Sequence, residues 1–422
     1  MRRLLAVLVL SISLGAKAGG YAIVVQDETP LRPTPGASAR PSAVLWQGET
    51  LEVRGVRLDY LEVWDYTRER GGYVRASQVR RLALSAEEAP ELLAILRFVR
   101  GVPGSEALGI GIAAAYIEAA PPAVLNGPEG VEALDHMGAM AERLARRPSP
   151  HVEVVARYGV RFVTVETKGR MRLCYDGAAY RKLLSMRATE EQRARAMLAL
   201  SEPACLRAEL TIAEMLESSN DAALPGYLRN RILMRRAALW ASLAYQQARK
   251  GESGAAAAER AASALEKVDR AELAEADRGA YGDAALRVRA SRVALARQVT
   301  SKGLRIVMAD AEKGQTCVVL VNGKNDELAK RCTYGHVWTA SAVVNGDASA
   351  LALAVQPADA WRELWLFHKT KKGWSVRVLP PAAIEPGVGY AEFAGWAPGK
   401  VRVTREAIVA GKLTRRTHLV RI

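Results

Sequence analysis

Cysteine and histidine are the residue types in this chain best suited to chemistry, yet their spacing argues against a catalytic centre. A cysteine nucleophile needs a histidine base in the same small domain, but no histidine follows Cys174 or Cys205 until His336. The five histidines are scattered and form no HExxH motif: His136, His151, His336, His368 and His418. The chain also lacks a GxSxG elbow and a GxxxxGKS/T phosphate loop. We therefore expect no catalytic residue, no metal and no cofactor, while distant paired carboxylates stay open as an alternative.

The cysteines instead indicate disulfide bonds. Cys174, Cys205, Cys317 and Cys332 form an even set, which allows three pairings. We favour 174 with 205 and 317 with 332, because each bridge then stays inside one predicted domain. No CxxC pair supports the alternative of a metal site.

The first residues have the layout of a secretory signal peptide. Arg2 and Arg3 precede an apolar run from Leu4 to Leu14, and Ala16-Lys17-Ala18 forms a small-residue cleavage site. The run is shorter than the roughly 20 residues of a membrane-spanning helix. We expect cleavage after Ala18 and a periplasmic or secreted protein without a transmembrane segment in the mature chain.

Length restricts the number of domains, and charge restricts the class of partner. The chain has 422 residues, a formal net charge of +15 and a pI near 9.8, and its length predicts two to four domains. Outside the cytosol, such a charge favours anionic envelope polymers or lipid headgroups as partners rather than nucleic acid. Because acidic residues are interleaved with the basic ones, an ordinary solvated surface explains the charge equally well.

Residues 19–83 are predicted to form a small all-β barrel. "YAIVV" at 21–25 is an apolar strand, and Leu51, Val53, Leu61 and Val63 alternate with polar residues in the next two. Gly71-Gly72 turns the chain into a last strand with Tyr73 and Val79. Several short alternating strands within about 60 residues are typical of a barrel.

These residues resemble the bacterial SH3-like (SH3b) family over about residues 22–82. Leu31-Arg32 stands where the family has its "vR", Gly48 precedes the "LEV" strand, and Gly72-Tyr73-Val74 is similar to the closing "GWV" with tyrosine in place of tryptophan. The resemblance implies a binding module attached to envelope proteins or cell-wall enzymes. It suggests Tyr60, Trp64 and Tyr73 as aromatic ligand contacts, with Arg32 and Arg75 for a carboxylate. The alternative is that some of these aromatic residues only fill a small core.

Residues 84–302 are predicted to form a mainly α-helical domain with one short β-hairpin. The hairpin covers the alternating segment from Phe162, turns at Lys168-Gly169 and ends near Cys174. Residues 225–270 resemble a single tetratricopeptide-like helical hairpin, through Leu243, Gly251, Ala256 and Ala264. No second copy is visible, so a generic helical hairpin is the safer description.

Residues 303–422 are predicted to form an antiparallel β domain. The segment 316–333 is nearly symmetric about Lys324-Asn325, which places Cys317 opposite Cys332 across a hairpin. "RELWLF" and "GWAPGKVRV" resemble blades of TolB-type β-propellers, but only about two blades fit, so a blade-like sheet without a ring is expected. We expect its tryptophans to serve core and edge packing.

Together these patterns predict a mixed multidomain protein: a signal peptide over 1–18, an SH3-like barrel over 19–83, a helical domain over 84–302 and a blade-like β domain over 303–422. The function expected is non-catalytic binding to peptidoglycan, another anionic envelope polymer or an envelope protein, as a scaffold or adaptor. A cryptic cell-wall hydrolase and a sensor or secretion accessory protein are the alternatives.

Overall fold

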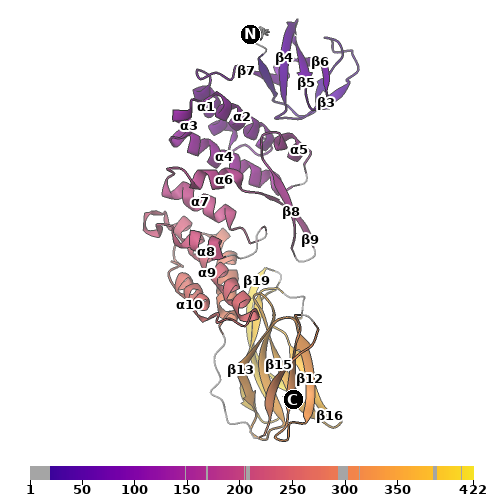
Figure 1. Ribbon diagram of the computed structural model, residues 1–422, viewed down its shortest axis with the longest axis vertical. Coiled ribbons are helices and arrows are strands. Elements are labelled where there is room, and N and C mark those ends of the chain that lie inside the picture. The colour runs from indigo at the N-terminus through magenta and orange to yellow at the C-terminus, as the bar shows by residue number, and fades with distance from the viewer. Residues whose placement is uncertain are drawn as a thin grey trace, which may run out of the picture. The chain divides into compact units, whose positions relative to one another are not determined.

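The computed structural model describes residues 20–147, 149–167, 170–203, 205, 210–292, 303–312, 314–383, 387–409 and 411–422. These residues gather into two compact units, Met1–Gln192 and Arg193–Ile422. The fold is mixed, with an N-terminal antiparallel sheet, a helical middle and C-terminal β-sheets (Figure 1). The predicted signal peptide, the Lys168-Gly169 turn and the boundary at residue 302 lie outside the described residues.

The N-terminal β module contains the strands expected from the alternating segments, but the prediction for Gly71-Gly72 is wrong. The two glycines lie inside the strand Arg70–Arg75 and not at a turn, and a 3-10 turn separates the strand of Tyr73 from the strand of Val79. Five strands form one antiparallel sheet in the order β6-β5-β4-β1-β7, and β2 pairs with β3 in a separate hairpin. Their bounds are β1 (Tyr21–Val24), β2 (Thr29–Leu31), β3 (Ala43–Leu45), β4 (Thr50–Arg57), β5 (Tyr60–Asp65), β6 (Arg70–Arg75) and β7 (Val79–Leu82), with a 3-10 turn η1 (Ala76–Gln78). The hairpin joins the sheet through backbone hydrogen bonds between Arg32 and Tyr73 in both directions.

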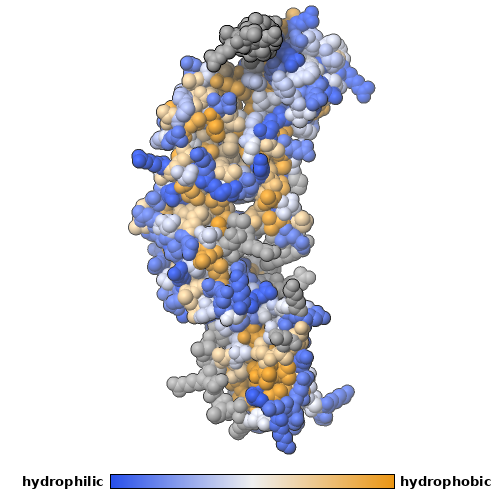
Figure 2. Space-filling view, viewed as in Figure 1, coloured by the Kyte–Doolittle hydropathy of each residue, from blue (hydrophilic) through white to orange (hydrophobic). Residues whose placement is uncertain are grey.

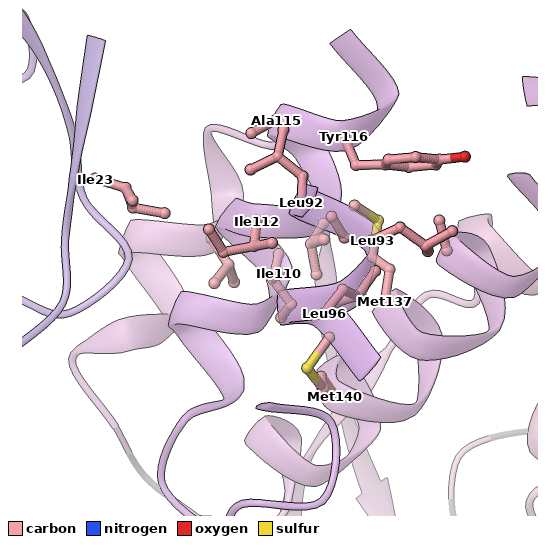
Figure 3. Packing of buried hydrophobic residues seen from close by; sticks show 14 of the residues in the cluster. Ile23, Leu92, Leu93, Leu96, Ile110, Ile112, Ala115, Tyr116, Met137 and Met140 are labelled. Atoms are coloured by element: carbon pink, nitrogen blue, oxygen red, sulfur yellow. The ribbon is translucent and has the colours of Figure 1, made fainter. Parts of the chain in front are cut away.

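Strand β1 contributes to two hydrophobic cores at once. Ala22 and Val24 pack in the core of the β module, whereas Ile23, which is 0% exposed, packs among helical residues (Figure 3). Alternate residues of a strand point to opposite faces, so an uninterrupted apolar run is the expected pattern for a strand covered on both sides. The predicted boundary near residue 84 therefore lies inside the first compact unit, where Leu82 also belongs to the helical core.

The first unit contains a group of helices, of which α2 (Glu106–Ala119) packs against the Ile23 face of β1. The others are α1 (Ala89–Val99), α3 (Pro122–Leu125), α4 (Pro128–Ala145), α5 (His151–Ala156) and α6 (Ala178–Leu184). The predicted hairpin is present as β8 (Phe162–Thr167) and β9 (Arg170–Tyr175). Helix α2 is the central helix, and its Gly111 leaves room for Ile23, because an added Cβ would lie 2.6 Å from the Ile23 Cδ1.

The second unit begins with helices. Helix α7 (Glu190–Leu200) crosses the division between the units and is followed by α8 (Leu210–Glu217), η2 (Asp221–Ala223), α9 (Gly226–Arg249), α10 (Ala255–Glu266), η3 (Glu275–Asp277) and α11 (Arg278–Ala290). Helices α9 and α10 pack against each other, as the generic helical hairpin requires. None of the helices in the described part of the chain is long and apolar enough to cross a membrane.

The C-terminal strands form a three-stranded and a seven-stranded sheet. The first contains β10 (Arg305–Asp310), β11 (Thr316–Val321) and β12 (Glu327–Thr333). The second contains β13 (His336–Val344), β14 (Ala350–Ala358), β15 (Trp361–Thr370), β16 (Gly373–Leu379), β17 (Gly389–Ala397), β18 (Lys400–Val409) and β19 (Lys412–Arg421). Strands β14 and β15 lie between two cores, one shared with β11 and one shared with β17 and β18. Trp361 and Trp365 are buried, in agreement with the expected packing role.

A buried arginine connects helix α11 to the large sheet. Arg362, near the start of β15, is 1% exposed and donates hydrogen bonds to the carbonyl oxygens of Ala290 (3.0 Å) and Arg292 (2.7 Å) at the end of α11. The last carbonyls of a helix have no partners within the helix and carry partial negative charge, which a guanidinium compensates. Burial lowers the pKa of Arg362 to about 10, so the side chain still carries its proton at neutral pH.

Replacing Gly48 with alanine tests the contact between the β module and α2. Gly48 has a φ of +90°, and an added Cβ would lie 2.6 Å from the carbonyl oxygen of Ala107. The positive φ disfavours any residue with a side chain, and the added Cβ would clash with α2. We therefore expect Gly48→Ala to lower the free energy of unfolding by about 2–4 kcal/mol. Gly36→Ala is the control, since nothing lies within 4 Å of its added Cβ. Equal urea midpoints for the two variants would contradict this packing.

Replacing Arg362 with methionine tests the helix connection. The variant keeps much of the side-chain volume but leaves the carbonyls of Ala290 and Arg292 without their donor, so we expect a loss of about 2–4 kcal/mol in the free energy of unfolding. Arg402→Met, at an exposed position of β18, should change stability by no more than about 0.5 kcal/mol. Denaturant unfolding of the full chain measures both. If Arg362→Met lowers the free energy of unfolding by less than about 1 kcal/mol, the hydrogen bonds from Arg362 to the carbonyls at the end of α11 do not contribute to stability as expected.

Candidate functional site

The N-terminal β module carries a pocket of about 380 Å³. Three of the five predicted ligand residues, Arg32, Tyr60 and Arg75, line it. The other lining residues are Gln26, Pro30, Ala37, Ser77 and Gln78. Figure 2 shows the visible face of this module, at the top of the view, as mainly hydrophilic.

Strand pairing explains how distant residues meet in this pocket. Tyr60 at the start of β5 lies directly opposite Arg75 at the end of β6, and residues opposed across an antiparallel pair point to the same face. Arg32 follows β2 and reaches the same end of the module because it pairs with Tyr73 of β6 through an antiparallel bridge. An added Cβ at Gly72 would lie 2.8 Å from the carbonyl oxygen of Arg32, so glycine is required for this close approach.

The two arginines are held in different ways. The Arg75 guanidinium lies over the Tyr60 ring, 5.7 Å from its centroid, and its Nη2 lies 3.4 Å from the Tyr60 hydroxyl. That hydrogen bond and the nearby Asp59 carboxylate, 3.5 Å from Nε, raise the pKa of Arg75. Arg32 donates from Nη1 to the carbonyl oxygen of Ala39. No acidic residue is among the described residues that line the pocket.

An amide pair forms another part of the pocket wall, and sequence reasoning missed it. Gln78 Nε2 lies 3.4 Å from Gln26 Oε1, and the backbone N–H of Val25 donates to the carbonyl oxygen of Gln78 at 3.0 Å. The only sequence signal is that each glutamine adjoins a predicted strand. Gln26 and Gln78 are 52 positions apart in the chain, and the pairing of β1 with β7 brings them together.

Trp64 and Tyr73 do not line this pocket. Trp64 is half-buried on β5, and the Arg54 guanidinium covers it at 4.4 Å from the ring centroid. Tyr73 is half-buried and connects to Arg32 through its backbone. Tyr60 is only 4% exposed, so its ring contributes to packing as well as to the pocket.

None of the cysteines or histidines is among the described residues that line the pocket. Cys317 and Cys332 form a disulfide across the β11–β12 hairpin, where they are paired in register. Cys174 and Cys205 are also disulfide-bonded, so none of the four cysteines is free. His136 is buried in α4, and burial lowers its pKa to about 4. Within the described residues, no group of three or more His, Cys, Asp or Glu side chains could hold a metal ion.

Alanine substitutions at Trp64 and Tyr60 separate surface from core roles on β5. Trp64→Ala removes a half-buried ring and a cation–π contact, so we expect a loss of about 1–2 kcal/mol in the free energy of unfolding. Tyr60→Ala removes an almost fully buried ring and should cost about 3–5 kcal/mol. Urea unfolding of the full chain gives both values. If Trp64→Ala costs as much as Tyr60→Ala, Trp64 belongs to the core.

Comparison of the chain with protein-family models, with curated proteins and with solved structures finds no match.

Proposed function

We propose that this is an exported, non-catalytic envelope protein whose N-terminal β module is SH3-like and binds a carboxylate-bearing segment of peptidoglycan. The observation that carries the proposal is the convergence of Arg32, Tyr60 and Arg75 on one pocket whose described lining residues include no acid. Each guanidinium offers a planar set of donors that matches a carboxylate. An envelope protein with an exposed carboxylate is the alternative partner.

The other walls of the pocket suit a peptide-like ligand. Gln26 and Gln78 provide amide donors and acceptors, and Pro30 and Ala37 provide apolar contact. Peptidoglycan stem peptides present amides, small apolar side chains and carboxylates within a short length. The size of the pocket, about 380 Å³, is within the range of ligand sites in proteins.

Export is supported by two independent features. Residues 1–18 have the charge and hydropathy layout of a signal peptide, and all four cysteines are disulfide-bonded. Disulfides persist in oxidising compartments such as the periplasm or the extracellular space. In such a compartment, the resemblance of residues 22–82 to SH3-like modules also favours an envelope ligand.

The test is co-sedimentation of the purified full chain with peptidoglycan sacculi. A fragment that ends at residue 83 would expose Ile23 and Leu82, so the full chain is used. We expect the double variant Arg32→Gln/Arg75→Gln to bind roughly 100-fold more weakly or worse, since hydrogen bonds to charged groups contribute about 1.5–3 kcal/mol each and two such groups are lost. Arg81→Gln is the control, because Arg81 is exposed on β7 and does not line the pocket.

Three outcomes distinguish the possibilities. Equal binding by the double variant and the control would overturn the pocket as the ligand site. Binding that disappears at moderate ionic strength in all variants would indicate diffuse charge attraction, because salt screens exposed charges beyond about 8 Å. Release of soluble fragments from sacculi would favour the hydrolase alternative, and capture of an envelope protein instead of sacculi would favour an adaptor role.

A further inference from the structure

The C-terminal β domain contains a second pocket, of about 660 Å³, at the β18–β19 hairpin. Arg405, Arg416 and His418 line it together with Thr414 and with Pro381 and Ala382, which follow β16. Val409 and Thr417 complete the lining. No carboxylate is among the described residues that form this wall.

The strand register forces two of these cations together. Arg405 on β18 lies directly opposite Arg416 on β19, and the uninterrupted register places His418 on the same face. Side chains opposed in this way have their Cβ atoms about 5 Å apart, and like charges there are destabilising. Neither arginine forms an ion pair with a described residue.

The other face of the same hairpin carries a buried acid. Glu406 is 2% exposed and lies opposite Arg415, and Arg289 of α11 and the Tyr390 hydroxyl both bond to its carboxylate. Glu406 and its donors therefore lie on the face opposite Arg405 and Arg416.

Arg405 also carries an unused donor. Its Nε is buried and has no hydrogen-bond partner in the structure. Burial, and then the charge of Arg377 on β16, lower the pKa of Arg405. Burial and the charge of Arg405 likewise lower the pKa of His418. A buried donor without a partner is unfavourable, and a bound acceptor would offset this cost.

From the opposed arginines, the unused Nε and the absence of a carboxylate among the described lining residues, we infer that this pocket binds a phosphate group. Phosphate carries about −1.5 to −2 charges at neutral pH and several strong acceptor oxygens, which match two guanidinium groups better than a monovalent carboxylate does. The group can belong to a soluble phosphate compound or to a phospholipid headgroup. This site is separate from the pocket proposed for peptidoglycan, and its ligand is of a different chemical class.

The experiment measures thermal unfolding of the full chain against inorganic phosphate, with ionic strength held constant by chloride. We expect phosphate to raise the midpoint for the unchanged protein, because a ligand that binds only the folded state stabilises it. Arg416→Gln should weaken the apparent phosphate affinity about tenfold, since a hydrogen bond to a charged group is lost. In the absence of phosphate, the unfolding midpoint of Arg416→Gln should stay the same or rise, because the substitution removes an exposed positive charge opposite Arg405.

Two matched variants make the result specific. Arg402→Gln removes the same charge from an exposed position on the opposite face of β18 and should keep the full response to phosphate. Arg32→Gln/Arg75→Gln should also keep it, which separates this site from the proposed peptidoglycan pocket. An equal response of Arg416→Gln and the unchanged protein, or an equal effect of chloride, would overturn the inference.

Vesicles distinguish the source of the phosphate. Co-sedimentation with phosphatidylcholine vesicles that contain phosphatidic acid, lost in Arg416→Gln, would support a lipid headgroup. A phosphate response without sedimentation would support a soluble phosphate compound. Failure of inorganic phosphate to bind overturns the inference whatever the vesicles show.

Discussion

The first unit depends on the burial of strand β1 from both sides. Ala22 and Val24 fill the core of the β module, and Ile23 fills a gap over α2 that Gly111 leaves open. A strand of only four residues thus connects a sheet and a helical bundle. Since each face is buried, a shift of register by one residue would exchange the two cores, and the register is strongly specified. The β module is consequently held in place by the helices beneath it.

This fixed register has a direct consequence for the candidate pocket. Strand β1 pairs with β7, which brings Gln26 and Gln78 together, and β5 pairs with β6, which places Tyr60 against Arg75. Arg32 joins them because Gly72 lets β2 approach β6 closely. The pocket is therefore built on paired strands. Preorganised side chains of this kind lose little entropy when a ligand binds.

In the second unit, two buried charged side chains of the large β-sheet bond to groups of helix α11. Glu406 is buried against α11 and is surrounded by the donors of Arg289 and Tyr390, while Arg362 compensates the carbonyls at the end of the same helix. Both features connect α11 to the sheet through groups that would be costly to bury alone. The opposite face of β18 has the reverse arrangement, since Arg405 and Arg416 are opposed without a described acid.

The sequence by itself determined the local structure: apolar alternation located the strands of the β module, helical periodicity located the middle, and near-symmetry about Lys324-Asn325 located the Cys317–Cys332 hairpin. These features depend on neighbouring residues, so a linear pattern contains them.

The tertiary structure decided which predicted ligand residues meet. Arg32, Tyr60 and Arg75 converge, whereas Trp64 on the same strand as Tyr60 is covered by Arg54. It also revealed the opposed Arg405 and Arg416, which depend on the register of the β18–β19 hairpin. It brought Gln26 and Gln78 together, because their proximity arises from the long-range pairing of β1 with β7, which short segments do not encode.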